Sequence, residues 1–186
     1  MALNLLEQLP PQPRLSTAAI HAQAEALRFA FADALQFCAD PAAGAGVAGL
    51  LDKERAAARW KQLFDGKARA NKVPPDAEGL RMGPDTVYLA AVDQWGNACS
   101  FINSNYMGFG TGIVPDGCGF TLQNRGHNFI LKEGHPNCVG PRKYCYHTII
   151  PGMVTHEDSS DLFCTLGVMG GFMQPQGHLQ VLCAMA

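Results

Sequence analysis

Two features of the sequence could supply the parts of a nucleophilic site. Thr86 opens an apolar segment directly after a stretch rich in proline and glycine. A threonine hydroxyl is a weak nucleophile, but cleavage before Thr86 would create an α-amine, with a pKa of about 8, that could act as its base. Gly170 and Gly171 follow another predicted strand, and two such adjacent N–H groups can form an oxyanion hole. From spacing alone, a strand-opening threonine and a glycine turn remain the simpler interpretation.

Other chemically suggestive residues give weaker predictions. The GFGTG segment at 108–112 lacks the strand, helix and lysine of a phosphate-binding loop, so a tight turn is favoured. Cys118 lies between glycines without an identifiable base, and the chain has no GxSxG motif. One set of four residues could be imagined as zinc ligands, but its spacing matches no standard site: His135, Cys138, Cys145 and His147.

The predicted secondary structure around these residues differs between the two halves of the chain, with helices in the first half. Apolar residues recur at helical spacing from Ile20 to Cys38, and Asp40-Pro41 should end that helix because proline disfavours helix at the preceding residue. A second helix is predicted at about 50–64. The stretch 71–85 has three prolines and two glycines without periodicity, which indicates an exposed connector.

After the connector the sequence predicts strands and turns. Residues 86–93 are apolar on both faces, which predicts a strand buried from both sides, and 98–103 should return as its hairpin partner. The intervening DQWG segment has type I turn chemistry. A second hairpin is predicted from 148–154 and 162–166, and a helix from Pro175 onward.

Composition excludes several classes of protein. The 186 residues are 47% hydrophobic and 16% charged, with a formal net charge of −2, which is typical of a globular chain. No basic run supports nucleic-acid or polybasic membrane binding. Neither a membrane-spanning apolar window nor a signal peptide is recognisable. Seven cysteines without CxxC spacing favour reduced thiols and a cytoplasmic compartment.

From Thr86 onward the chain resembles the γ-glutamyltranspeptidase family of N-terminal-nucleophile (Ntn) hydrolases. The matching stretches are TVYLAAVDQWGNACSFINSN, GFGTGIVPDGCGFTLQN, GPRKYCYHTIIPGMV and GVMGGFMQPQGH, and residues 17–64 resemble the helical end of the large subunit. The resemblance implies an α+β fold, a four-layer αββα sandwich of which this chain holds a part. It divides the chain into a large-subunit region 1–72, a connector 73–85 and a small-subunit region 86–186.

The resemblance also implies the roles of individual residues. The precursor would cleave itself between Asp85 and Thr86, and the two segments would stay together. Thr86 would then attack the γ-amide of a glutamyl compound such as glutathione, and the acyl group would pass to water or to an amine. Ser104, where the family usually has threonine, would orient the amine of the nucleophile, and Gly170-Gly171 would bind the oxyanion. This chemistry needs no cofactor and no metal.

The substrate pocket departs from the family pattern. Tyr106, Arg125 and Asn128 stand where the family has Asn, Gln and Asp around the glutamyl α-amine, and His147-Thr148 replace paired serines. Two positive charges, the arginine and a partly buried ammonium, repel each other. At an intermediate effective dielectric constant this repulsion is on the order of a few kcal/mol. The exchange predicts an acylase resembling cephalosporin acylases, which takes acyl groups such as glutaryl without an α-amine and with a carboxylate facing Arg125.

The resemblance covers only part of a family member, without most of the large subunit and the end of the small one. A second hypothesis is therefore a truncated, catalytically inactive fragment. A third, a binding module without chemistry, has only generic support. The sequence leaves the acyl donor, the acceptor and the balance of hydrolysis and transfer open.

Overall fold

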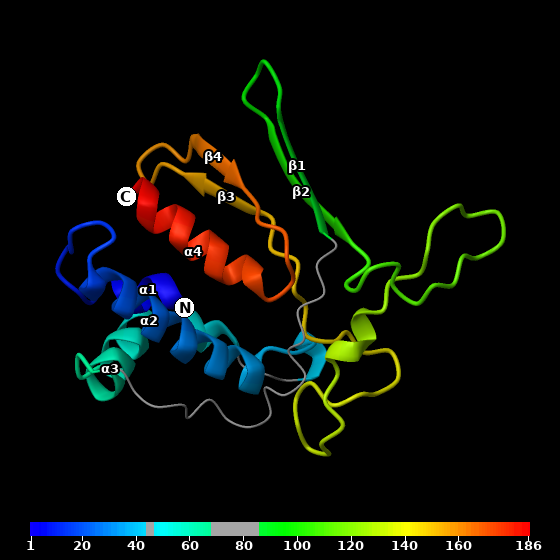
Figure 1. The fold of residues 1–186 in the computed structure, drawn as a ribbon, viewed down its shortest axis with the longest axis horizontal. Coiled ribbons are helices and arrows are strands. Elements are labelled where there is room, and N and C mark those ends of the chain that lie inside the picture. Colours follow the sequence, from blue (N-terminus) through cyan, green and yellow to red (C-terminus); the bar gives the residue numbers. More distant parts are fainter. Residues whose placement is uncertain (44–46, 68–85) are drawn as a thin grey trace. The chain divides into compact units, whose positions relative to one another are not determined.

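The computed structural model describes residues 1–43, 47–67 and 86–186, and its elements give an α+β chain (Figure 1). It forms two compact units that alternate along the sequence. The first unit comprises Met1–Gly79, Asn128–Tyr146 and Leu179–Ala186, and the second comprises Leu80–His127 and His147–His178. Residues distant in sequence therefore share a unit, and each unit is described separately below.

The first unit contains the helices predicted near the N-terminus. Helix α2 (Thr17–Phe37) begins where the Ser16 hydroxyl accepts a hydrogen bond from the Ala19 N–H, three residues before the apolar periodicity starts. The predicted helix at 50–64 is divided into a 3-10 helix η2 (Val47–Leu51) and helix α3 (Lys53–Leu63). Asp52 causes the division, because its carboxylate accepts from the Arg55 N–H and caps α3.

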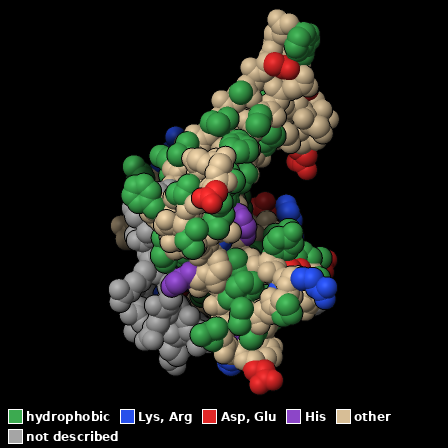
Figure 2. Space-filling model, turned by 90° about the vertical axis from the view of Figure 1, so that its right-hand side faces the viewer, with side chains coloured by type: hydrophobic (Ala, Val, Ile, Leu, Met, Phe, Trp, Pro, Cys, Tyr) green, Lys and Arg blue, Asp and Glu red, His purple; other side chains and the backbone are tan. Residues whose placement is uncertain are grey.

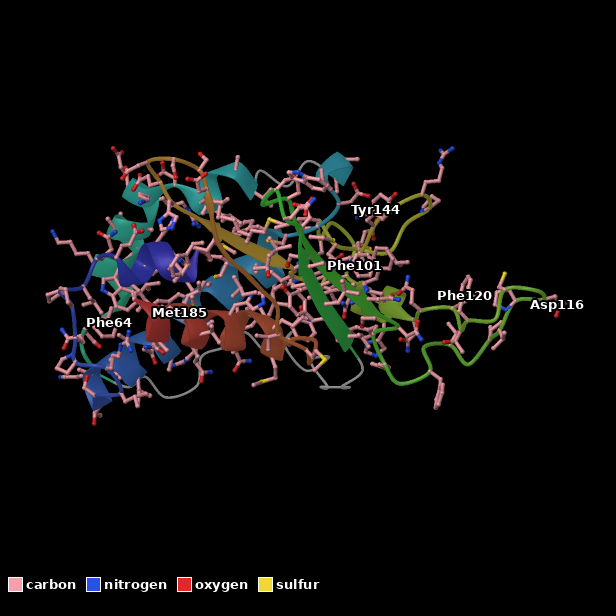
Figure 3. All side chains as sticks on the ribbon, turned by 90° about the horizontal axis from the view of Figure 1, so that it is seen from above. Phe64, Phe101, Asp116, Phe120, Tyr144 and Met185 are labelled. Carbon is pink, nitrogen blue, oxygen red and sulfur yellow. The ribbon has the colours of Figure 1, made fainter. Side chains whose placement is uncertain are left out.

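A small hydrophobic core holds these helices together. Its buried members come from α2, α3 and a short helix α1 (Ala2–Leu6) that the sequence pattern had not indicated: Leu5, Ala22, Ala26, Ala56 and Trp60. The alanines allow close approach of the helix backbones around the Trp60 indole. The indole stacks on Phe64, which is labelled in Figure 3, at 4.2 Å between ring centroids.

The segment from Asn128 to Tyr146 is fixed within this unit by side-chain hydrogen bonds. The buried Asn137 donates from Nδ2 to the Asn128 carbonyl at 2.7 Å and accepts on Oδ1 from the Tyr146 N–H at 2.9 Å. The Asp40 carboxylate accepts from the Tyr144 N–H at 2.7 Å. One asparagine thus joins the two ends of a 19-residue segment that has almost no regular secondary structure.

The second unit contains the two predicted hairpins. Strand β1 (Thr86–Val92) pairs antiparallel with β2 (Ala98–Ser104), and the turn between them closes with a hydrogen bond from Gly96 N–H to the Asp93 carbonyl. Strand β3 (Gly152–Thr155) pairs with β4 (Leu162–Leu166). Strand β3 is shorter than the predicted 148–154, and the Ile150 N–H donates to the Gln174 side chain instead of to a strand.

The expectation that β1 is buried from both sides is wrong. One face of the hairpin lies against β4, where Ser100 Oγ approaches the Leu166 carbonyl at 3.5 Å. On the other face Val87 and Leu89 are exposed, as is Phe101 opposite Leu89 (Figure 3). Alternating side chains point to opposite faces of a strand, so covering one face leaves the other to solvent.

A loop and the first part of a helix complete the second unit, whose last residue is His178. Residues 105–124 form a long irregular loop, with Asp116 near its outer end and Phe120 closer to β2 (Figure 3). Helix α4 (Met173–Met185) begins two residues before the predicted Pro175, which lies in its first turn, where its missing N–H costs no helical hydrogen bond. Within the described residues, no helix is long and apolar enough to cross a membrane.

Candidate active site

The two hydroxyl groups singled out from the sequence meet at the open end of the first hairpin. Thr86 and Ser104 are direct partners in the β1–β2 register, so their side chains lie on the same face. Thr86 Oγ1 donates a hydrogen bond to Ser104 Oγ at 3.3 Å, and Thr86 is buried. Ser104 Oγ also accepts from the Tyr106 N–H at 3.0 Å. The serine is thereby oriented towards the threonine that is the candidate nucleophile.

Arg125 connects this pair with the segment that precedes β3. Its side chain is buried, and Nη1 donates to Thr148 Oγ1 at 2.5 Å while Nη2 donates to the Ser104 carbonyl at 3.2 Å. Its guanidinium carbon lies 5.3 Å from the centroid of the Tyr106 ring, within cation–π range. Tyr106 is itself buried and has a positive φ of 78°. Four of the predicted site residues therefore contact one another around the arginine.

The arginine makes its surroundings electropositive. The pKa of His147 is lowered from its ordinary value, first by burial and second by the charge of Arg125, against the opposing effect of the hydrogen bond from the Ile149 N–H. His147 Nδ1 accepts that bond at 3.0 Å, so the imidazole helps to shape the chain that carries Thr148. A positive potential at this position favours anionic over cationic ligand groups.

The glycine pair lies in the loop between β4 and α4. Gly170 and Gly171 have φ values of 116° and 55°, a region that residues with a side chain rarely adopt. Their carbonyls accept from the N–H groups of Met173 and Gln174 and so start helix α4. Their own N–H groups have no acceptor among the described residues. Two adjacent uncommitted donors can stabilise the oxyanion of a tetrahedral intermediate.

The loop that carries the glycines also contacts strand β1. The Tyr88 ring lies so close to Gly167 that a Cβ there would come within 2.1 Å of it. The Tyr88 hydroxyl is 3.1 Å from Ser100 Oγ, which points to the Leu166 carbonyl. The strand that begins with the candidate nucleophile is thereby packed against the start of the glycine loop.

Two predicted site residues are not part of this arrangement. Asn128 belongs to the first unit, where its Nδ2 donates to the Tyr146 carbonyl at 3.0 Å. Asp85, on the other side of the proposed cleavage point, lies outside the described residues. Their roles stay predictions.

The alternative motifs have structural explanations. The GFGTG segment makes two consecutive turns, in which the N–H groups of Gly110 and Gly112 donate three residues back. The imagined zinc set is divided between the two units, with His147 in the second. Within the described part of the chain, no group of three His, Cys, Asp or Glu residues could hold a metal ion.

The chain belongs to the gamma-glutamyltranspeptidase family, which matches it over residues 1–186. It is 37% identical over 166 residues to the glutathione hydrolase-like YwrD proenzyme of Bacillus subtilis, covering 89% of this chain and 30% of that protein. It is 41% identical over 95 residues to the oxamate amidohydrolase proenzyme of Klebsiella pneumoniae, covering 50% and 18% respectively.

A solved structure resembles the chain over nearly its whole length. The cephalosporin acylase from Bacillus halodurans aligns with a TM-score of 0.81 and 40% identity, covering 97% of this chain and 32% of that one. The chain thus spans about a third or less of the length of these relatives. The family resemblance inferred from the motifs is confirmed.

Several residues that hold the site in place were not predicted from the sequence. His178, on α4, accepts a hydrogen bond from the Val168 N–H in the glycine loop. Tyr88 packs on the same loop, and Asn137 holds Asn128. The one available signal was the unusual run QPQGH after the glycine pair, whose polar residues interrupt an otherwise apolar helix.

Proposed function

We propose that this chain carries the nucleophile of an amide-cleaving acyltransferase or hydrolase, which matures by autocleavage between Asp85 and Thr86. The observation that carries the proposal is the hydrogen bond from Thr86 to Ser104 at the buried start of β1. In this proposal, 1–72 is the large-subunit region, 73–85 is the connector that ends at the cleavage point, and 86–186 is the small-subunit region. The two segments remain associated after cleavage. We further propose that the two hairpins contribute strands to a four-layer αββα sandwich.

In the proposed reaction, the α-amine freed at Thr86 accepts the hydroxyl proton as Oγ1 attacks the carbonyl carbon of the substrate amide. The N–H groups of Gly170 and Gly171 stabilise the resulting oxyanion. The intermediate collapses, the C–N bond breaks, and the leaving amine takes the proton, which leaves an ester on Thr86. Water or a second amine then attacks this ester and regenerates the hydroxyl. Every step uses groups of the chain, so neither a cofactor nor a metal is required.

We infer that the acyl group carries a carboxylate and lacks an α-amine, as glutaryl does. The support is the buried guanidinium of Arg125, whose charge adds to the effect of burial in lowering the pKa of His147. An ammonium group would be repelled here, whereas a carboxylate would be attracted. Two relatives agree with this choice. One is a cephalosporin acylase, and the other is named for the hydrolysis of oxamate, which is an anionic amide.

A second candidate substrate class is γ-glutamyl compounds such as glutathione. The observation in its favour is the 37% identity to a glutathione hydrolase-like proenzyme over most of the chain. A paired assay with glutaryl and γ-glutamyl anilides separates the two, with kcat/KM as the readout. We expect higher kcat/KM for the glutaryl anilide, and a clear preference for the γ-glutamyl compound would reject the anionic-acyl proposal.

The maturation step is tested by the intact mass of the purified protein beside a Thr86→Ala variant. Two pieces that meet at Asp85–Thr86, absent from the variant, support the proposal. The Thr86→Ser variant is the matched control, because serine keeps the hydroxyl and should still cleave. A single uncut species in the wild type contradicts the proposal and favours the second hypothesis, an inactive fragment.

A further inference from the structure

We propose that His178 is a positioning residue for the glycine pair, which it holds in place through the main chain at Val168. The proposal deepens the proposed function, because it rests on Gly170 and Gly171 serving as oxyanion donors. His178 itself touches no reacting atom in this scheme. It determines where the two donors stand.

The contact is a single buried hydrogen bond between a helix and a loop. His178 Nε2 accepts from the Val168 N–H at 3.2 Å, and only 9% of the residue is exposed. Val168 is two residues before Gly170. Glycine has more backbone freedom than any other residue type. An anchored peptide group two residues before the glycine pair therefore restricts a part of the chain that would otherwise adopt many conformations.

The neighbouring glycine in the helix brings the imidazole within reach. A Cβ on Gly177 would lie 2.7 Å from Val168 Cγ1, so only a glycine lets the backbone of α4 approach the Val168 side chain this closely. Val168 is therefore held by its side chain against Gly177 and by its N–H on His178. On the other side of the loop, the Tyr88 ring packs on Gly167.

The glycine pair is also held from its C-terminal side. The carbonyls of Gly170 and Gly171 accept from the first N–H groups of α4, and the Gln174 side chain accepts from the Ile150 N–H at 3.0 Å. Gln174 is almost fully buried. With anchors before and after them, the two glycines are left with N–H groups that have no acceptor among the described residues, as preorganised donors require.

The acceptor must be an unprotonated ring nitrogen. An imidazolium has two donors and no acceptor, and would face the Val168 N–H with another N–H. Burial lowers the pKa of His178, which keeps the imidazole neutral near neutral pH. A glutamine side chain can present a carbonyl oxygen in place of Nε2, whereas a leucine side chain of similar volume cannot.

The test compares His178→Leu with His178→Gln, using the glutaryl anilide and the γ-glutamyl anilide as substrates. We expect the leucine variant to lower kcat about 10- to 100-fold with KM changed less than threefold, since a misplaced oxyanion donor acts on the transition state. The glutamine variant should recover kcat to within a few-fold of the wild type. His156→Gln, in the exposed turn between β3 and β4, is the matched control.

Two results overturn the proposal. One is a leucine variant with kcat within twofold of the wild type, and the other is a glutamine variant as impaired as the leucine variant, which would indicate a packing role only. Amide hydrogen exchange at Val168 provides a readout independent of activity. We expect faster exchange in the leucine variant and retained protection in the glutamine variant. If the wild type cleaves neither anilide, the proposed function fails, and unchanged Val168 exchange would separately reject the anchor.

Discussion

At the scale of single residues, the candidate site depends on hydroxyl groups with defined partners. Ser104 Oγ accepts from both Thr86 Oγ1 and the Tyr106 N–H, so it is oriented by the loop that follows its own strand. A nucleophile held by such a partner keeps its geometry before substrate arrives, and small displacements of reacting groups are costly. Removing the Ser104 hydroxyl should therefore test the orientation of the nucleophile while leaving the Thr86 hydroxyl itself in place.

We expect Ser104→Ala to lower kcat about 100-fold, because Thr86 loses the acceptor that orients its hydroxyl. Ser104→Thr keeps the hydroxyl, and β-branched residues suit a strand, so its kcat should stay within a few-fold of the wild type. Steady-state kinetics on both variants give the comparison. Equal activity of alanine and serine at this position would show that the bond to Thr86 has no catalytic role.

Arg125 is expected to determine the charge of the acyl group that the site accepts. Arg125→Gln removes the cation and keeps a donor for Thr148 Oγ1. We expect the ratio of kcat/KM for γ-glutamyl over glutaryl anilide to rise roughly tenfold or more, which corresponds to about 1.4 kcal/mol. The measurement is the pair of kcat/KM values in one preparation, with thermal unfolding as a check on folding. An unchanged ratio would mean that the arginine is purely structural.

At the scale of elements, the site depends on how a loop is clamped between a strand and a helix. Tyr88 on β1 and His178 on α4 contact consecutive residues of the loop, Gly167 and Val168. Neither the strand nor the helix carries the glycine donors itself. Their packing converts a flexible glycine sequence into a defined backbone path.

This clamp predicts a pH-dependent contribution to stability. Burial lowers the pKa of His178 in the folded protein below the unfolded value of about 6.5. The unfolded state therefore binds the proton first, so the contribution is fully present above the unfolded pKa and is lost as pH falls through the folded pKa. We expect the unfolding midpoint of the wild type to fall more between pH 8 and pH 5, roughly the range around that pKa, than the midpoint of His178→Gln.

The comparison with the glutamine variant isolates His178, because His147, whose pKa is also lowered, is present in both proteins. Thermal unfolding followed by circular dichroism at both pH values measures the difference. Identical midpoint shifts in the two proteins would show that the imidazole does not titrate in the predicted sense.

At the scale of the whole molecule, the β1–β2 hairpin has one apolar face exposed to solvent. Val87 is 65% exposed, Leu89 49% and Phe101 48%, and Figure 2 shows hydrophobic side chains along the hairpin at the top of the view. Contiguous apolar surface of this kind promotes association. The chain spans about a third of the length of relatives with which it aligns over most of its own length.

We expect the double substitution Leu89→Lys and Phe101→Glu to reduce self-association and the binding of a hydrophobic dye. These residues are direct partners in the register, so the new charges attract each other across the strands. The free energy of unfolding should change by only about 1 kcal/mol, because both side chains are already half exposed. Sedimentation velocity and dye fluorescence are the measurements.

The matched control is Ile102→Glu on the buried face, which should abolish cooperative unfolding. If the double variant on the exposed face lost cooperative unfolding as well, both faces of the hairpin would be needed for folding and the prediction would fail.

Features that depend on local periodicity and on motif order could be predicted from the sequence. Helix α2, both hairpins and the turn at Asp93 were predicted because helical spacing, strand patterns and turn residues act over a few neighbouring positions. The family followed from four ordered stretches around Thr86 and Gly170-Gly171.

Features that depend on contacts between residues distant along the chain became visible only in the folded structure. The pattern of β1 could not show which face is covered, because that depends on β4, which begins 70 residues after β1 ends. The sequence showed that Arg125 stands where the family has glutamine. It did not show the hydrogen bonds of this arginine to Ser104 and Thr148. The polar run QPQGH marked the start of α4 as unusual, but nothing local showed which partner His178 has. Its significance comes from one N–H on a loop that only packing brings within 3.2 Å.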